Sequence, residues 1–119
     1  MASQAGVLDL RLAAGIAPSS EPTRALLGDP DEHPDRYEHA SPRARLPTGV
    51  PQLVLHGDRD DTVSMRIATS YAAAANAAGD PCELRVLTRT GHFEHTDPRT
   101  PAWHTARDWL VAQTSAARS

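Results

Sequence analysis

The stretch Gln-Leu-Val-Leu-His-Gly-Asp-Arg-Asp-Asp-Thr-Val, residues 52–63, decides how this chain folds. Its apolar residues Leu53, Val54 and Leu55 follow one another without a polar interruption. A continuous run of this kind is typical of a strand that is covered on both faces, as in a parallel sheet. Gly57 ends the strand, and an acidic loop follows it. This stretch therefore predicts a buried strand with polar groups at its carboxyl end.

Alternating elements follow this strand. From Ser64 onward apolar residues recur at helical spacing, and either Asp61 or Ser64 can cap the start, while Gly79 is placed to end the helix. The segment 83–88 reads as a second strand, and Thr100-Pro101 reads as the start of a last helix. The order strand, helix, strand, helix predicts an α/β fold with parallel strands and right-handed crossovers. Two strands alone leave unpaired edges, so we expect a further strand beside them.

The chain divides into two parts of different character. Residues 1–50 are polar and broken by prolines, and we interpret them as a variable segment after a sheet strand, a cap remnant followed by a linker over 43–49. Within this part, helical spacing covers 7–17, a single helical turn is expected over 23–27, and a short helix is expected over 34–40. Residues 51–119 carry the regular strand–helix–strand–helix unit.

Composition excludes several classes of protein. The chain has 119 residues and a net charge of −3, so neither a nucleic acid nor a membrane surface is an expected partner. The single cysteine, Cys82, excludes an internal disulfide framework and a cysteine zinc cage. No apolar run is long enough to span a membrane, and the first residues lack the pattern of a secretory signal. A cytoplasmic location is therefore expected.

Two loops carry the residues suited to chemistry. One is the loop 56–63, with its three aspartates, and the other is the loop 90–94, which contains Gly91 and His92. Both follow the carboxyl ends of predicted parallel strands, which is where such sheets place functional groups. If the strands are adjacent, an aspartate can accept the Nδ1 hydrogen bond of His92 and orient the ring as a general base.

These residues resemble those of a known family. Residues 53–63, followed by Gly91-His92-Phe93, are similar to the C-terminal portion of the α/β-hydrolase superfamily, near its esterase, lipase and prolyl-oligopeptidase-like branches. The resemblance implies a partial three-layer α/β/α fold with two or three parallel strands. It also implies that Asp60, three residues after Gly57, is the acid of a Ser-His-Asp triad, and that His92 is its base. Residues 2–7 would then end the strand that follows the nucleophile strand.

One element of the family pattern is missing from these 119 residues. The nucleophile of the family lies in Gly-x-Ser-x-Gly, N-terminal to the Asp and the His, and no serine of this chain has that context. A smaller departure is Ser64, where the family often has proline. The resemblance thus implies a fragment of a serine hydrolase that acts on small-molecule esters or on amides and peptides, inactive alone and needing no cofactor or metal. The alternatives are a chain that complements a separate chain carrying the nucleophile, and a non-catalytic binding module.

Other interpretations of the same residues remain open at this point. Asp60 could cap the following helix, and His92 could be an ordinary loop histidine. A metal cluster is a third possibility, with the candidate ligands His92, Glu94, His95, Asp97 and His104. Cys82 is an unlikely replacement nucleophile, because it precedes its strand at the end opposite the two loops.

Overall fold

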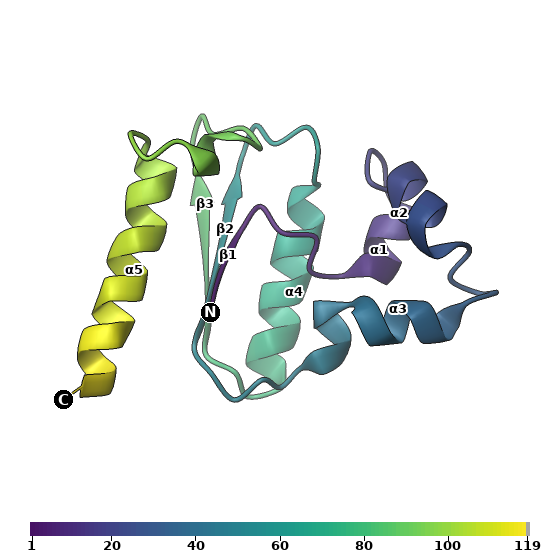
Figure 1. Cartoon of the computed structure of the whole chain (residues 1–119), viewed down its shortest axis with the longest axis horizontal. Helices are drawn as coiled ribbons and strands as arrows, with labels where there is room; N and C mark the ends of the chain where they lie inside the picture. Colours follow the sequence, from purple (N-terminus) through teal and green to yellow (C-terminus); the bar gives the residue numbers. More distant parts are fainter. Residues whose placement is uncertain (119) are drawn as a thin grey trace.

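Three parallel strands form one sheet in the computed structural model, which describes residues 1–118 (Figure 1). They are β1 (Ala2–Gln4), β2 (Gln52–Gly57) and β3 (Cys82–Leu87), in the spatial order β1-β2-β3. Ala2 lies opposite Leu53 in the first pair, and Gln52 lies opposite Cys82 in the second. The predicted fold class, a partial α/β fold with two or three parallel strands and flanking helices, is confirmed. β3 begins one residue earlier than expected, at Cys82.

The two long helices cover opposite faces of the sheet (Figure 1). On one face Val54 packs in a cluster with residues of α4 (Met65–Ala77) such as Ile67 and Tyr71. On the other face Leu53 and Leu55 pack against Ala106 of α5 (Pro101–Arg118). Successive side chains of a strand point to opposite faces, so the apolar run of β2 supplies both cores. This is the physical reason why the run has no polar residue.

Both helices begin where the sequence indicates. The Ser64 hydroxyl accepts a hydrogen bond from the Arg66 N–H at 3.2 Å and caps α4, so Ser64 rather than Asp61 takes that position. Gly79, just after α4, has φ +100°, a backbone conformation that glycine adopts at little cost. α5 starts at Pro101, whose missing N–H costs nothing in the first turn of a helix.

The N-terminal part contains more helix than its prolines suggest. It forms α1 (Leu10–Gly15), α2 (Ser20–Leu27), α3 (Pro34–Ala40) and a 3₁₀ turn, η1 (Pro42–Arg45). The prediction of a single turn over 23–27 was wrong. Pro22 lies in the first turn of α2, where the backbone N–H groups have no intrahelical partner, so it does not break the helix.

None of the helices within residues 1–118 is both long enough and apolar enough to cross a membrane. The expected cytoplasmic location stays a prediction from the sequence.

The carboxyl ends of β2 and β3 are held in close backbone contact at Gly57. A Cβ atom at this position would collide with the carbonyl group of Thr90, in the loop after β3. The loops after the two strands can therefore lie this close together only if residue 57 has no side chain.

This contact generates a stability prediction. Gly57→Ala should lower the free energy of unfolding by about 1–3 kcal/mol, because the Thr90 backbone must move to admit the methyl group. Gly15→Ala is the matched control, since a Cβ there has no neighbour within 4 Å, and it should be neutral or slightly stabilising. Urea denaturation of the two variants and the wild type measures the difference. Equal midpoints for Gly57→Ala and the wild type would contradict the packing described here.

Candidate functional site

The loops that follow β2 and β3 are joined by backbone hydrogen bonds. The Asp58 N–H donates to the Leu87 carbonyl at 3.0 Å, and the Arg59 N–H donates to the Thr90 carbonyl at 3.0 Å. The Thr90 N–H in turn donates to Asp58 Oδ1 at 3.4 Å. Parallel pairing brings the carboxyl ends of both strands to one edge of the sheet, and these bonds fix one loop against the other.

Asp60 and His92 meet across this junction. His92 Nδ1 donates a hydrogen bond to Asp60 Oδ2 at 2.9 Å, while Asp60 Oδ1 accepts from the N–H groups of Thr62 at 2.9 Å and Val63 at 2.8 Å. The Asp60 side chain is only 1% exposed. Both carboxylate oxygens thus accept hydrogen bonds, which hold the carboxylate in one orientation.

The hydrogen bonds determine the charge state of Asp60. Burial alone would raise the pKa of this carboxyl group. The hydrogen bonds from the Val63 N–H, the His92 ring and the Thr62 N–H outweigh burial and lower the pKa of Asp60 below its ordinary value. The side chain is therefore an anion at neutral pH, which is the form that holds and stabilises an imidazolium.

The His92 ring is only partly buried. Its side chain is 22% exposed, and its edge-to-face contact with the exposed Phe93 places the ring centroids 4.9 Å apart. An open depression adjoins it, lined by Arg59, Asp61, Gly91, His92, Phe93, Glu94, Thr96 and Asp97. Because Nδ1 donates to Asp60, Nε2 is the nitrogen left to take up a proton. In this arrangement Nε2 can act as a general base, and Asp60 can orient the ring.

Two buried histidines lie beside this pair. Neither was predicted to have a role in the triad, although His56 was placed in the loop 56–63 and His95 was named as a candidate metal ligand. His56, at the end of β2, is fully buried, and its Nε2 donates to the Val63 carbonyl at 2.7 Å and lies 3.4 Å from Asp60 Oδ2. His95 lies in η2 (Glu94–Thr96) and is also buried, and neither ring nitrogen has a hydrogen-bond partner. The available signal for His56 was its polar ring directly after the apolar run Leu53-Val54-Leu55.

The structure bears on three alternative interpretations. Asp60 does not cap α4, because Ser64 does, so its two backbone hydrogen bonds shape the preceding turn instead. Within residues 1–118, no three His, Cys, Asp or Glu side chains lie close enough together to hold a metal ion. The residues around His92 that were candidates for a metal cluster therefore do not form a ligand set. Cys82 is the first residue of β3, so it lies at the end of the strand opposite the loop that carries His92. Burial raises the pKa of its thiol.

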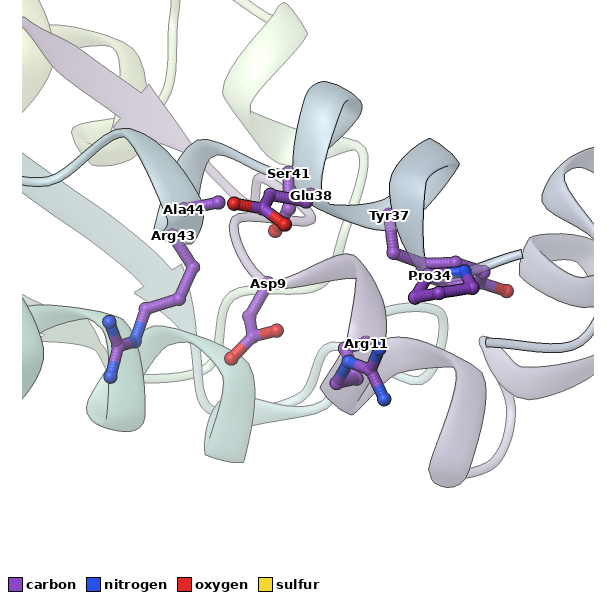
Figure 2. Close-up of a pocket in the computed structure, with 8 residues that line it drawn as sticks. All are labelled: Asp9, Arg11, Pro34, Tyr37, Glu38, Ser41, Arg43 and Ala44. Carbon is purple, nitrogen blue, oxygen red and sulfur yellow. The ribbon is translucent and has the colours of Figure 1, made fainter. Parts of the chain in front are cut away.

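A second pocket lies on the N-terminal helices (Figure 2). It brings together carboxylates and guanidinium groups from α1, α3 and η1, among them Asp9, Arg11, Glu38 and Arg43. Asp9 caps α1 through the Leu12 N–H, and Arg11 lies 3.8 Å from Asp31. Asp9 and Arg11 thus have local partners, and none of the residues lining this pocket is a histidine that could pair with a carboxylate as His92 does with Asp60, so the strand-end site remains the candidate.

A parallel α/β sheet with an Asp–His pair on the loops after neighbouring strands is the arrangement of an α/β-hydrolase. The family model of the prolyl oligopeptidase family matches residues 1–116, and the chain belongs to this family. The predicted resemblance is thereby confirmed. No curated protein sequence matches the chain.

Solved structures show the same fold. An acylaminoacyl peptidase of Pyrococcus horikoshii matches 80% of this chain with a TM-score of 0.68 and 13% identity, and the match covers 16% of its own length. A propionate-bound esterase of Thermogutta terrifontis matches 93% of the chain with a TM-score of 0.66 and 22% identity, over 40% of its length. A puromycin hydrolase mutant matches 76% with a TM-score of 0.63 and 26% identity, over 14% of its length. The chain thus spans well under half of each of these proteins.

The buried His95 predicts how the stability of the site depends on pH. Burial first, and then the nearby His56, lower the pKa of His95 below its ordinary value of 6.5. The unfolded chain therefore binds more protons than the folded chain as the pH falls through 6.5, and stability is lost at up to about 1.4 kcal/mol per pH unit. Asp60 affects stability at lower pH. Its pKa is lowered in the fold, so its stabilising contribution is lost only as the pH falls below the ordinary pKa value of 3.8.

Urea denaturation at pH 7 and pH 5 tests this assignment. His95→Leu should reduce the loss of stability between the two pH values, and at pH 7 it should cost little, because it also removes two unpaired buried nitrogens. His104→Leu replaces an exposed histidine of α5 and should keep the wild-type pH dependence. The same pH dependence in His95→Leu and the wild type would exclude His95 as the group responsible.

Proposed function

We propose that this chain supplies the general base and its orienting acid to a serine hydrolase that cleaves ester or peptide bonds. The observation that carries the proposal is the 2.9 Å hydrogen bond between His92 Nδ1 and the buried carboxylate of Asp60. Membership of the prolyl oligopeptidase family supports the peptide bond as a substrate, and the likeness to an esterase and to a puromycin hydrolase supports esters and amides.

The proposed reaction assigns one role to each residue. His92 Nε2 takes the proton of a serine hydroxyl while the serine oxygen attacks the carbonyl carbon of the substrate. His92 then gives that proton to the leaving alcohol or amine, and the acyl group stays on the serine. In the second half His92 deprotonates a water molecule, which releases the acid and restores the serine. Asp60 holds the ring in register and stabilises the imidazolium.

The nucleophile must come from outside these 119 residues. None of their serines lies in Gly-x-Ser-x-Gly, and the backbone donors that stabilise the oxyanion belong with that motif. Without these two components His92 and Asp60 retain only weak general-base chemistry toward water. The proposal therefore concerns this chain together with a segment that carries the motif, either as one longer protein or as a complementing chain.

The test combines the chain with a segment of another prolyl oligopeptidase family member that carries Gly-x-Ser-x-Gly. Hydrolysis of an activated ester should fall about 10³–10⁴-fold in Asp60→Asn and in His92→Ala, because the base loses its orientation or is absent. His104→Ala and Asp108→Asn alter the same residue types on the exposed side of α5 and should keep the full rate. The chain assayed alone should hydrolyse the ester only at a trace rate, far below that of the combined protein.

Two results would contradict the proposal. One is an unchanged rate in Asp60→Asn or His92→Ala within the combined protein. The other is His92-dependent turnover by the isolated chain at a rate comparable with that of the combined protein, which would mean that the nucleophile lies within these 119 residues after all.

A binding or complementing module is the second candidate function, and an exposed apolar groove favours it. The groove lies between β1 and α5, and it is lined by Ala2, Gln4, Trp103, Ala106, Arg107, Leu110 and Val111. Val111 is 59% exposed and Leu110 is 45% exposed. Within the described residues β1 pairs with β2 alone, so its other edge is open to a further strand. Large apolar surfaces of this kind typically mark interaction sites.

Val111→Glu tests the groove as a docking surface. The charge should abolish co-sedimentation with the nucleophile-bearing segment, whereas Ala112→Glu, at an exposed position next to it but outside the groove, should not. Sedimentation velocity of the mixtures measures the complex. Complex formation that restores no hydrolysis would favour a non-catalytic module, and equal binding by both variants would show that the groove is not the surface used.

A further inference from the structure

His56 places a polar ring in a fully buried position of β2. It is the fifth residue of β2, after Leu53, Val54 and Leu55, and its side chain is only 1% exposed. Its Nδ1 is buried without a hydrogen-bond partner. A leucine here would avoid the unpaired Nδ1, so the imidazole needs a reason beyond filling space.

The other ring nitrogen supplies that reason. His56 Nε2 lies 2.7 Å from the Val63 carbonyl oxygen, and because a carbonyl oxygen only accepts, Nε2 carries the proton and donates. The N–H group of Val63 donates in turn to Asp60 Oδ1 at 2.8 Å. Val63 is thus held through its carbonyl oxygen by His56, while its N–H holds Asp60.

The same nitrogen also lies beside the reacting pair. His56 Nε2 is 3.4 Å from Asp60 Oδ2, and this is the oxygen that accepts the 2.9 Å bond from His92. The partial positive charge of the Nε2–H group therefore lies near the carboxylate oxygen that accepts from His92. The turn 60–63 is hydrogen-bonded to the buried ring at Val63 and lies close to it at Asp60.

We infer that His56 is a positioning residue for the proposed reaction: its Nε2–H group fixes the turn 60–63 so that Asp60 Oδ2 meets His92 Nδ1. The consequence for catalysis rests on the proposed function. The geometric statement does not, because the bond between Asp60 and His92 can be observed in the chain without any turnover.

Two substitutions separate a hydrogen-bonding role from a packing role. His56→Gln places an amide N–H group near the position of Nε2, whereas His56→Leu fills the space and offers no donor. The readout is the hydrogen-bonded Nδ1 proton of His92 in the proton NMR spectrum, identified by its loss in His92→Ala, and its exchange rate with solvent. The exchange should be at least about tenfold faster in His56→Leu and close to wild type in His56→Gln, because only leucine releases the turn.

The outcomes are distinguishable. A His92 proton as protected in His56→Leu as in the wild type overturns the inference, and so does an equal loss in both variants, which would mean that only the imidazole shape matters. If His56→Leu does not fold, as judged by circular dichroism, the tautomer of His56 in the ¹⁵N-labelled wild type decides. The Nε2–H form supports the inference, and the Nδ1–H form overturns it.

In the combined protein used to assay hydrolysis, His56→Leu should lower kcat about tenfold to a hundredfold and leave KM unchanged, because a displaced base slows the chemistry without touching the substrate. His56→Gln should restore most of the rate. An absence of hydrolysis in the wild-type combination would count against the proposed function, while the NMR comparison would still judge His56.

Discussion

The close approach of β2 and β3 at their carboxyl ends is the constraint on which the rest of the structure depends. Gly57 and the Thr90 carbonyl touch without a side chain between them, and the loops beyond them share backbone hydrogen bonds. Loops held in this way deliver two side chains from positions 32 residues apart to a separation of 2.9 Å. Backbone contacts between the two loops thus position Asp60 and His92 relative to the rigid sheet. The exposed parts of the loops contribute little to this positioning.

Burial and hydrogen bonding act on the acid in opposite directions, and hydrogen bonding prevails. A carboxylate that is almost fully buried would ordinarily be driven to its neutral form, which cannot stabilise an imidazolium. Three donors to Asp60 reverse this, two from the backbone of its own turn and one from His92. The turn 60–63 therefore does more than end a strand, because its shape sets the charge and the direction of the acid. His56 extends the same network one step into the core.

Much of this arrangement could be predicted from residue order, and the exceptions have physical causes. The apolar run of β2 and the spacing of α4 fix strands and helices, and the loops that carry Asp60 and His92 follow from where parallel strands end. The length of α2 was underestimated, because the sequence alone does not distinguish a proline in the first turn of a helix from one that breaks a helix. His56 and His95 could not be placed at the site, since their burial depends on packing between segments far apart along the chain. Capping of α4 by Ser64 rather than Asp61 was likewise decided by local backbone geometry.

The central claim is that Asp60 holds His92 with the proton on Nδ1, so that Nε2 is free to act as a base. The ¹⁵N chemical shifts of the His92 ring in the folded chain at neutral pH test this most directly, with Asp60→Asn measured alongside. The account predicts the Nδ1–H tautomer in the wild type and a shift toward the Nε2–H tautomer in Asp60→Asn, which can donate to Nδ1. An Nε2–H tautomer in the wild type, or a ring that does not respond to the loss of the carboxylate, would contradict it.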